Sequence, residues 1–423
     1  MRPVKRMQPC ATAMVWGLLA ATALAACSKG GGSLDAESPK AKTSQEAAAE
    51  PSRKAFDPPV RFEDARIELS SAAQPSTVSG GAKRPAVTLS GGIAYITTEQ
   101  GLEAIDTQTG EPRWEAATKH PAEAGGFGSP RAAPLAVEAW TVYAAWERVV
   151  KGEGTTPSRP VIEVLAVDTT TGKPSWSAEI PAVPSATGLA ANAIGADEVI
   201  APQIIGVDAD TVVVAAADTT YAVDRAAGTV RWKKADFRAV ALADGVVAGG
   251  ERLTPLESRL IGYAAGTGKQ RWTIRGTGAP ASAGPELLTG ERGNKQLIVD
   301  AASGTVRATL AGSDWQCRHD AESLLLCSTF RSLAGTGITV FDAATVRKLW
   351  TLPDGSGRIV PRVTAFWHGA VYGDIGQEPE SVILDGKTGK DRETSPGAAP
   401  FEVDRYGGLV DRMGPPAFYR ATR

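Results

Sequence analysis

The 423-residue sequence is poor in the side chains that build metal and catalytic sites. It has four cysteines, two asparagines (Asn192 and Asn294) and three histidines (His120, His319 and His368). Because these residues lie far apart in the sequence, we predict no metal site. The patterns G-x-S-x-G, H-E-x-x-H and the P-loop are also missing, so the sequence assigns no catalytic residue.

The sequence has no excess of charge of one sign. It carries 45 basic and 47 acidic residues, for a formal net charge of −2, and no basic stripe. This balance argues against a dedicated nucleic-acid-binding protein. The hydrophobic fraction is 43%, and the 46 glycines and 28 prolines are spread along the chain. These values are typical of a folded, turn-rich protein rather than a disordered one.

The first 27 residues have the pattern of a secretory signal. The positive charges at its start are Arg2, Lys5 and Arg6. The apolar run 11–26 that follows is short for a membrane span, and residues 24–27 (LAAC) resemble the bacterial lipobox. The resemblance implies cleavage before Cys27, acylation of its thiol with palmitate-type chains, and an extracytoplasmic protein anchored to the cell membrane, at the cell surface or in the periplasm. The alternative is a secreted protein in which Cys27 has no special role.

Residues 28–56 consist mainly of Gly, Ser, Ala, Lys and Glu, with almost no large apolar residue. Such a segment buries too little surface to offset its ordering entropy. We therefore predict a flexible linker over 28–56 and a single folded domain over 57–423.

One motif recurs every roughly forty residues from residue 85 onward, which is typical of a propeller or solenoid. Its clearest copies are AIDTQTGEPRW (104–114), AVDTTTGKPSW (166–176) and AVDRAAGTVRW (222–232), and degenerate copies begin at residues 262, 298, 340 and 383. The Asp position holds Asp106, Asp168, Asp224, Ala264, Asp300, Asp342 and Asp385. Four residues later stand Gly110, Gly172, Gly228, Gly268, Gly304, Val346 and Gly389. Eight residues after the Asp position stand Trp114, Trp176, Trp232, Trp272, Ala308, Trp350 and Glu393.

We interpret this motif as structural. An Asp that enters a turn accepts hydrogen bonds from the N–H groups two and three residues later, and the Gly adopts a positive φ to complete the hairpin. The Trp supplies a large apolar plate that packs between adjacent repeats. The alternative is that the spaced Trp side chains form a stacking platform for a carbohydrate or a quinone.

The repeat resembles the tryptophan-docking motif of the pyrroloquinoline-quinone (PQQ)-like β-propellers, and the resemblance covers residues 60–423. That superfamily contains quinoprotein alcohol dehydrogenases as well as the propeller lipoprotein of the outer-membrane protein assembly machinery. It implies an all-β, WD40-like ring of four-stranded blades.

The ends of the chain predict the number of blades. Seven motif copies are visible, and residues 407–413 and 417–422 have the pattern of two further strands. The segment 60–69 is a spare strand that, paired with them, would close the ring and remove both sheet edges. We predict eight blades, with seven as the alternative.

The resemblance to quinoprotein dehydrogenases would require two adjacent cysteines over the cofactor, a calcium ion held by acidic and Asn ligands, and a catalytic Asp. No two cysteines are adjacent, and neither Asn192 nor Asn294 lies in an acidic cluster. The pair Asp208 and Asp210 suits a hairpin turn better than a calcium site. We predict neither PQQ nor any other cofactor, and a quinone-dependent oxidoreductase remains the alternative function.

Cys317 and Cys327 flank a segment that has the pattern of strand, turn (319–323) and strand. Two cysteines that face each other across a hairpin reach disulfide distance, and thiols oxidise outside the cytoplasm. We predict a disulfide, with two buried free thiols as the alternative. Cys10 lies in the signal segment.

Long insertions are expected at one end of the ring. We name the strands of a four-stranded blade A to D from the axis outward. Because strand direction alternates, the A–B and C–D turns lie at one end of the ring, and the B–C loops and D–A connections lie at the other. The D-x-x-T-G segments are C–D turns, whereas 119–134 and 182–206 are D–A connections and 147–160, 251–259 and 331–337 are B–C loops. Binding residues concentrate on such loops. The candidate contacts are Arg148, Lys151, Arg159, Arg252, Arg259 and Arg331. The expected function is a membrane-anchored scaffold that binds an envelope protein or ligand, and a further alternative is an envelope sensor.

Overall fold

The computed structural model describes residues 53–69, 75–77, 83–120, 132–137, 140–182, 201–254, 257–329, 337–375, 380–411 and 416–423. Residues 53–423 form one compact unit. The predicted signal segment, Cys27 and the linker as far as residue 52 lie outside the described residues. No helix within these ranges is long and apolar enough to cross a membrane.

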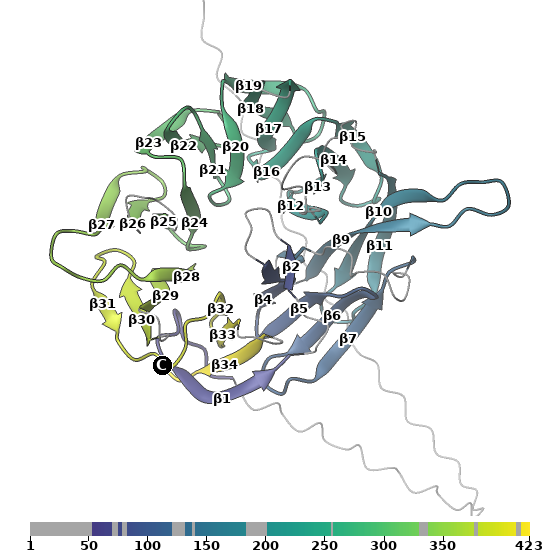
Figure 1. Ribbon diagram of the computed structural model, residues 1–423. Helices are drawn as coiled ribbons and strands as arrows, with labels where there is room; N and C mark the ends of the chain where they lie inside the picture. The colour runs from purple at the N-terminus through teal and green to yellow at the C-terminus, as the bar shows by residue number, and fades with distance from the viewer. Residues whose placement is uncertain are drawn as a thin grey trace, which may run out of the picture. The chain divides into compact units, whose positions relative to one another are not determined.

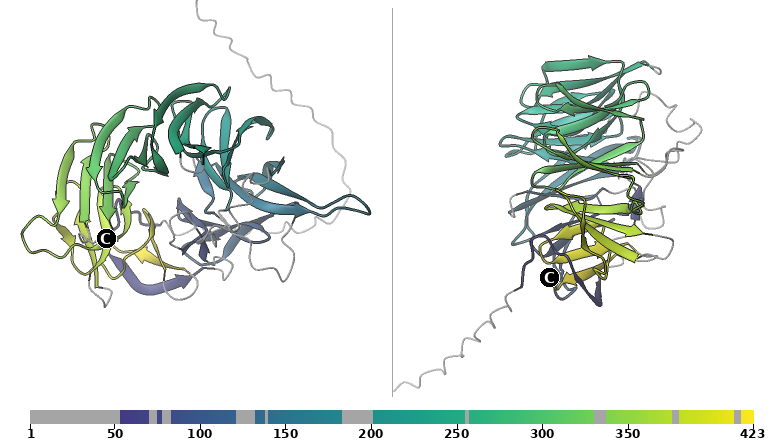
Figure 2. Two further views of the ribbon diagram at one scale, coloured as in Figure 1. Left: turned by 45° about the horizontal axis from the view of Figure 1, so that its top comes forward. Right: turned by 90° about the vertical axis from the view of Figure 1, so that its left-hand side faces the viewer.

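The described residues form eight four-stranded antiparallel sheets and one two-stranded sheet. The sheets follow one another around a ring (Figure 1), and their strands run across its thickness (Figure 2). This arrangement is an eight-bladed β-propeller.

Blade 1 contains β4 (Val87–Ser90), β5 (Ile93–Thr97), β6 (Gly101–Asp106) and β7 (Pro112–Ala117). Blade 2 contains β8 (Leu135–Val137), β9 (Thr141–Val150), β10 (Arg159–Asp168) and β11 (Pro174–Pro181). Blade 3 contains β12 (Gln203–Val207), β13 (Thr211–Ala216), β14 (Thr219–Asp224) and β15 (Val230–Lys234); blade 4 contains β16 (Phe237–Ala243), β17 (Val246–Thr254), β18 (Glu257–Ala264) and β19 (Gln270–Arg275).

The second half of the ring repeats this order. Blade 5 contains β20 (Gly278–Ser282), β21 (Leu287–Glu291), β22 (Lys295–Asp300) and β23 (Val306–Ala311); blade 6 contains β24 (Trp315–His319), β25 (Leu324–Thr329), β26 (Gly337–Asp342) and β27 (Lys348–Leu352). Blade 7 contains β28 (Arg362–Trp367), β29 (Ala370–Ile375), β30 (Glu380–Asp385) and β31 (Asp391–Glu393); blade 8 contains β32 (Glu402–Asp404), β33 (Gly407–Val410), β34 (Ala417–Ala421) and β1 (Phe62–Glu68). A small hairpin of β2 (Pro75–Thr77) and β3 (Lys83–Pro85) precedes blade 1.

The N-terminal strand closes the ring, as predicted. β1 is the outermost strand of blade 8 and pairs with β34 through Ile67↔Phe418 and Glu68↔Ala417. The prediction of eight blades is therefore confirmed. β32, the short innermost strand of this blade, was not predicted from the sequence.

The middle strands of each blade are apolar on both faces because both faces are covered by neighbouring blades. All five residues from Thr211 to Ala215 of β13 are buried, whereas β15, on the outside of the same sheet, is mostly exposed. The inner strand β16 alternates between buried and half-buried residues. The hydrophobic core is accordingly divided into clusters that lie between adjacent blades.

Residues 53–61 cross one end of the ring before they enter β1. Arg53 Nη1 donates to the Gly92 carbonyl of blade 1 at 2.7 Å, and the Phe56 N–H donates to the Arg405 carbonyl of blade 8 at 2.7 Å. The Tyr372 hydroxyl of blade 7 donates to the Pro59 carbonyl at 2.8 Å. Arg53 and Phe56, at the end of the predicted linker, thus contact the propeller.

Candidate functional site

The Asp of each repeat motif folds its own turn. Asp224 Oδ1 accepts hydrogen bonds from the N–H groups of Ala226 (2.9 Å) and Ala227 (2.8 Å), and Asp168 Oδ1 makes the equivalent bonds in blade 2. The hydrogen bond from Arg231, followed by those from the turn, holds the pKa of Asp224 below its usual range. The motif glycines have positive φ; Gly172, for example, has φ +69°. These side chains build the hairpin, as predicted.

Each motif tryptophan docks on the turn of the following blade. The Trp176 indole N–H donates to the Arg225 carbonyl at 2.7 Å, and a Cβ added to Gly228 would lie 2.9 Å from the Trp176 ring. The glycine is therefore required by the close approach of the ring as well as by its φ. Within the described residues the same bond is made by Trp114, Trp232, Trp272 and Trp350.

The predicted disulfide between Cys317 and Cys327 is present. The two residues are directly paired between β24 and β25, with 4.0 Å between their Cα atoms. The turn between these strands is held by Asp320, whose Oδ1 accepts from the N–H groups of Ser323 and Leu324, each at 2.8 Å. The bond links two neighbouring strands of one blade, so it is a structural crosslink.

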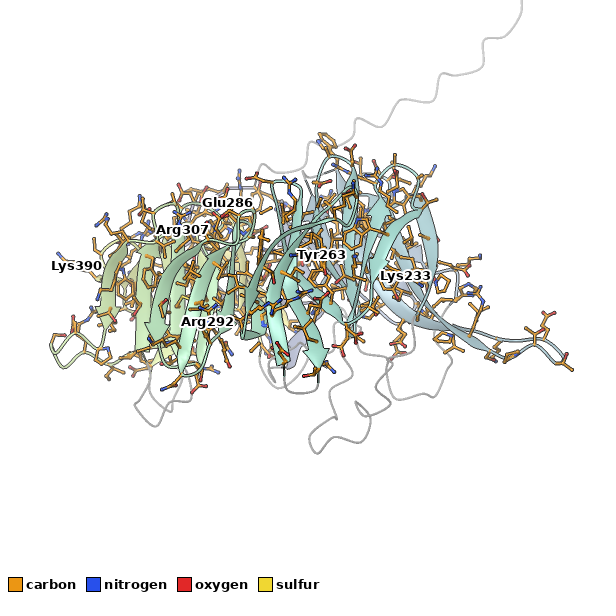
Figure 3. The ribbon with its side chains drawn as sticks, turned by 90° about the horizontal axis from the view of Figure 1, so that it is seen from above. Lys233, Tyr263, Glu286, Arg292, Arg307 and Lys390 are labelled. Atoms are coloured by element: carbon orange, nitrogen blue, oxygen red, sulfur yellow. A yellow bond between two sulfur atoms is a disulfide. The ribbon has the colours of Figure 1, made fainter. Side chains whose placement is uncertain are left out.

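The loops separate into two ends of the ring, as the strand directions require. The A–B and C–D turns lie together because the N–H after each motif Asp donates to an A–B turn; Thr107 N–H to the Gly92 carbonyl, at 3.1 Å, is one case. We call this side the tight-turn end and the opposite side the long-loop end. Figure 3 shows Glu286 and Arg307 at the tight-turn end and Arg292 at the long-loop end.

The described long loops belong to the long-loop end, although the predicted loops 119–134, 182–206 and 331–337, with Arg331, lie mostly outside the described residues. The most prominent described loop is the hairpin of β9 and β10, which extends past the outer edge of the ring (Figures 1 and 3). Residues 151–158 at its tip are exposed apart from half-buried Gly152, and Val149 is 60% exposed. A further D–A connection, 353–361, was not predicted from the sequence, and its Ile359 is also exposed.

Arg148 is not an exposed contact residue, contrary to the prediction. Only 4% of its surface is exposed, and its Nη2 donates to the Glu99 carbonyl of blade 1 at 2.7 Å. The guanidinium also lies 5.8 Å from the centre of the Trp146 ring. The residue sits near the end of β9 but faces the neighbouring blade, so its role is to join blades 1 and 2.

A carboxylate at the base of the hairpin contacts several basic side chains. Glu179 forms ion pairs with Lys119 and with Arg159 (3.2 Å), and its Oε1 lies 3.0 Å from Nε2 of His120. The hydrogen bonds from Lys119 and then His120 lower the pKa of Glu179 to about 2. The buried Glu163 accepts hydrogen bonds from the N–H groups of Lys119 and His120. The start of the D–A connection is thereby attached to the base of the hairpin.

Two further candidate cations, Arg252 and Arg259, lie beside a mixed-charge cavity. Arg252 Nη2 donates to Asp218 Oδ2 at 2.7 Å, and Arg259 Nε donates to Glu251 Oε2 at 2.6 Å. Burial, and then the hydrogen bond that its hydroxyl donates to Glu251, raise the pKa of Tyr263. The cavity, of about 320 Å³, is lined by these acids and Arg252. Lys151 is exposed on the hairpin.

The described residues offer no metal site, because no three His, Cys, Asp or Glu side chains among them are placed to hold an ion. Asp208 Oδ1 instead accepts from the N–H groups of Asp210 (2.9 Å) and Thr211 (2.7 Å), which is the turn role that the sequence analysis favoured.

Comparison with solved structures finds several chains that are similar over most of this chain. BamB from Moraxella catarrhalis is 16% identical, with 85% of this chain and 97% of that chain covered and a TM-score of 0.40. Quinohemoprotein alcohol dehydrogenase from Comamonas testosteroni is 12% identical over 86% of this chain and 76% of that chain, with a TM-score of 0.46. The C-terminal WD40 domain of Sif2 is 9% identical over 86% and 99%, and its TM-score of 0.50 supports the fold alone. No curated protein sequence matches the chain.

A family model described as outer membrane protein assembly factor BamB matches residues 67–203, 162–314 and 257–422. The three matches overlap and together span the propeller from β1 to β34. The chain therefore belongs to this family.

Proposed function

We propose that this protein is a membrane-anchored scaffold of the cell envelope whose propeller binds a protein partner with its long-loop end. The family match over residues 67–422 carries the proposal, because the family is that of an outer membrane protein assembly factor. The motif side chains support a scaffold rather than an enzyme, since their polar atoms are bonded within the turns that they build.

The long-loop end is the better docking surface of the two ends. Its hairpin of β9 and β10 offers exposed Val149 and a charged tip with Lys151 and Glu153. Glu163 and Glu179 attach the base of this hairpin to the preceding connection, so the hairpin is presented by a rigid support. Loops on a rigid scaffold are where binding residues concentrate.

Site-specific photo-crosslinking in intact host cells tests this surface. A photoreactive amino acid at Val149 should capture a partner protein, because this side chain is 60% exposed on the hairpin. Val306 is the matched control, since it is 41% exposed and lies at the tight-turn end. Capture of the same protein from Val306 but not from Val149 would place the docking surface on the opposite end.

The anchor is tested separately from the docking surface. Cys27→Ser removes the thiol that a lipid thioether needs, so this variant should lose labelled fatty acid and leave the membrane fraction. Cys10→Ser changes the same atom within the signal segment and should behave as the wild type. Fatty acid incorporation by Cys27→Ser would contradict the lipoprotein proposal.

A further inference from the structure

A cavity of about 540 Å³ opens at the tight-turn end, between blades 2 and 3. Blade 2 lines it with Tyr143, Ser175 and the docked Trp176. Blade 3 lines it with Asp210, Arg225 and Arg231. None of these residues belongs to the proposed docking surface, which lies at the other end of the ring.

The cavity exists because blade 2 departs from the repeat at one position. The residue before the motif Trp is Arg113 in blade 1 and Arg231 in blade 3, and each guanidinium binds the Asp of its own turn, at 2.6 Å in both cases. Blade 2 has Ser175 at this position, so the volume of a guanidinium is left open beside Trp176.

In blade 3, a second residue beside the cavity differs from the repeat pattern. The residue after the motif Asp is Thr or Ala in most repeats, but here it is Arg225. Its Nε donates to the Tyr143 hydroxyl at 3.2 Å, and its Nη1 donates to the Asp208 carbonyl at 3.0 Å. The guanidinium is therefore fixed as one wall of the cavity.

The lining fits a neutral ligand that has many hydroxyl groups. An anion would meet the carboxylates of Asp210 and Asp224, and a cation would meet Arg225 and Arg231. A hydroxyl both donates and accepts, so it can use the Arg donors and the Asp acceptors together. The half-buried ring of Trp176 adds an aromatic surface for the C–H face of a sugar ring, and the buried Tyr143 ring packs beside it, with the two centroids 6.1 Å apart.

We propose that this cavity binds a neutral saccharide segment of about two rings. Cavities of roughly 300–1000 Å³ enclose ligands of this size. The site does not rest on the proposed scaffold function, because the two surfaces lie at opposite ends of the ring and are changed by different substitutions.

Titration calorimetry of the full chain with the neutral disaccharides chitobiose and cellobiose tests the site. We expect saturable binding of at least one of them. Ser175→Arg restores the side chain that blades 1 and 3 carry, so it should fill the cavity and abolish binding. Thr170→Arg adds the same charge to an exposed position of the adjacent turn and should bind as the wild type does.

Tyr143→Phe keeps the ring and removes only the hydroxyl, so it provides a second test if Ser175→Arg fails to fold. It should weaken binding roughly tenfold, as expected for the loss of one well-placed hydrogen bond. Unchanged affinity in a folded Ser175→Arg variant would overturn the proposal. So would the absence of saturable binding by the wild type, or tighter binding of glucuronic acid or glucosamine than of either disaccharide.

Discussion

From blade 1 to blade 7, the interfaces between adjacent blades, here called seams, are of two kinds in the described structure. At five seams a tryptophan docks on the next turn, donates its indole N–H to a carbonyl and lies too close to the motif glycine for an unstrained Cβ. At the seam between blades 5 and 6, Ala308 replaces the tryptophan and Val346 replaces the glycine, with φ +53°. Because a Cβ at the glycine position of a docked seam would lie too close to the ring, the valine at position 346 requires that no tryptophan dock there.

The seam between blades 5 and 6 also contains the disulfide. Val346, Cys317 and Cys327 belong to one core cluster, against which Ala308 packs. The indole hydrogen bond is replaced by one from Arg307 Nη2 to the Ala344 carbonyl. At this seam the adjoining blade is crosslinked and no aromatic plate is present, so a blade interface of this ring can form without a docked tryptophan.

The largest effect is expected at a docked seam. Trp232→Ala should lower the free energy of unfolding by about 3 kcal/mol, because it leaves a cavity against blade 4 and removes the bond to the Ala265 carbonyl. Thermal melting followed by circular dichroism measures the loss. Trp140→Ala is the matched control, because Trp140 is 68% exposed and should be dispensable. Equal melting temperatures for the two variants would show that tryptophan docking does not stabilise the ring.

Removal of the disulfide should have a slightly smaller effect. The variant Cys317→Ser/Cys327→Ser should unfold about 2–3 kcal/mol more easily, since the bond closes a short loop of the unfolded chain. Wild-type protein melted with a thiol reductant should match the double variant, which should itself be insensitive to reductant. If the reductant leaves the melting temperature of the wild type unchanged, the disulfide does not stabilise the fold.

The two replacements at the seam between blades 5 and 6 can be reversed by mutation at positions 308 and 346. Ala308→Trp alone should cost about 2 kcal/mol, because the new ring meets the Val346 side chain. Addition of Val346→Gly should recover most of this loss, since it removes the clash and the positive φ of a β-branched residue. Chemical denaturation of the single and double variants measures the coupling. Additive losses would mean that the two positions do not pack against each other.

The smallest effect concerns the turns themselves, which we expect to be alike at both kinds of seam. Burial raises the pKa of Asp300, but hydrogen bonds from Ser303 and Arg307 outweigh it, and the bonds from Thr345 lower the pKa of Asp342. A lowered pKa stabilises the fold above the ordinary value of 3.8 and loses this effect as the pH falls through the folded-state value.

Asp300→Asn and Asp342→Asn should therefore each lower the melting temperature slightly at pH 7 and leave it nearly unchanged near pH 2. Melting curves at both pH values give the result. A difference from the wild type that persists at low pH would assign the effect to packing rather than to the carboxylate charge.

The repeated parts of the fold were predictable because the same physical demand recurs in every blade. Asp, Gly and Trp at fixed spacing indicated the turns and the docking plates, and the spare strand at 60–69 indicated how the ring closes. Arg148 was misplaced because sequence does not show which face of a strand meets a neighbour. The cavity beside Ser175 was also missed, although its signal was present as a serine in a position that is mostly Arg.

The path of residues 53–61 determines how the ring would respond to mechanical load. Arg53 is bonded to blade 1, through Gly92 and Gln108, and Phe56 is bonded to blade 8. A pull on the N-terminal side of Arg53 is therefore shared by both blades that flank the closure before any tension reaches β1. The outermost strand of blade 8 is thus protected from being peeled away from its sheet.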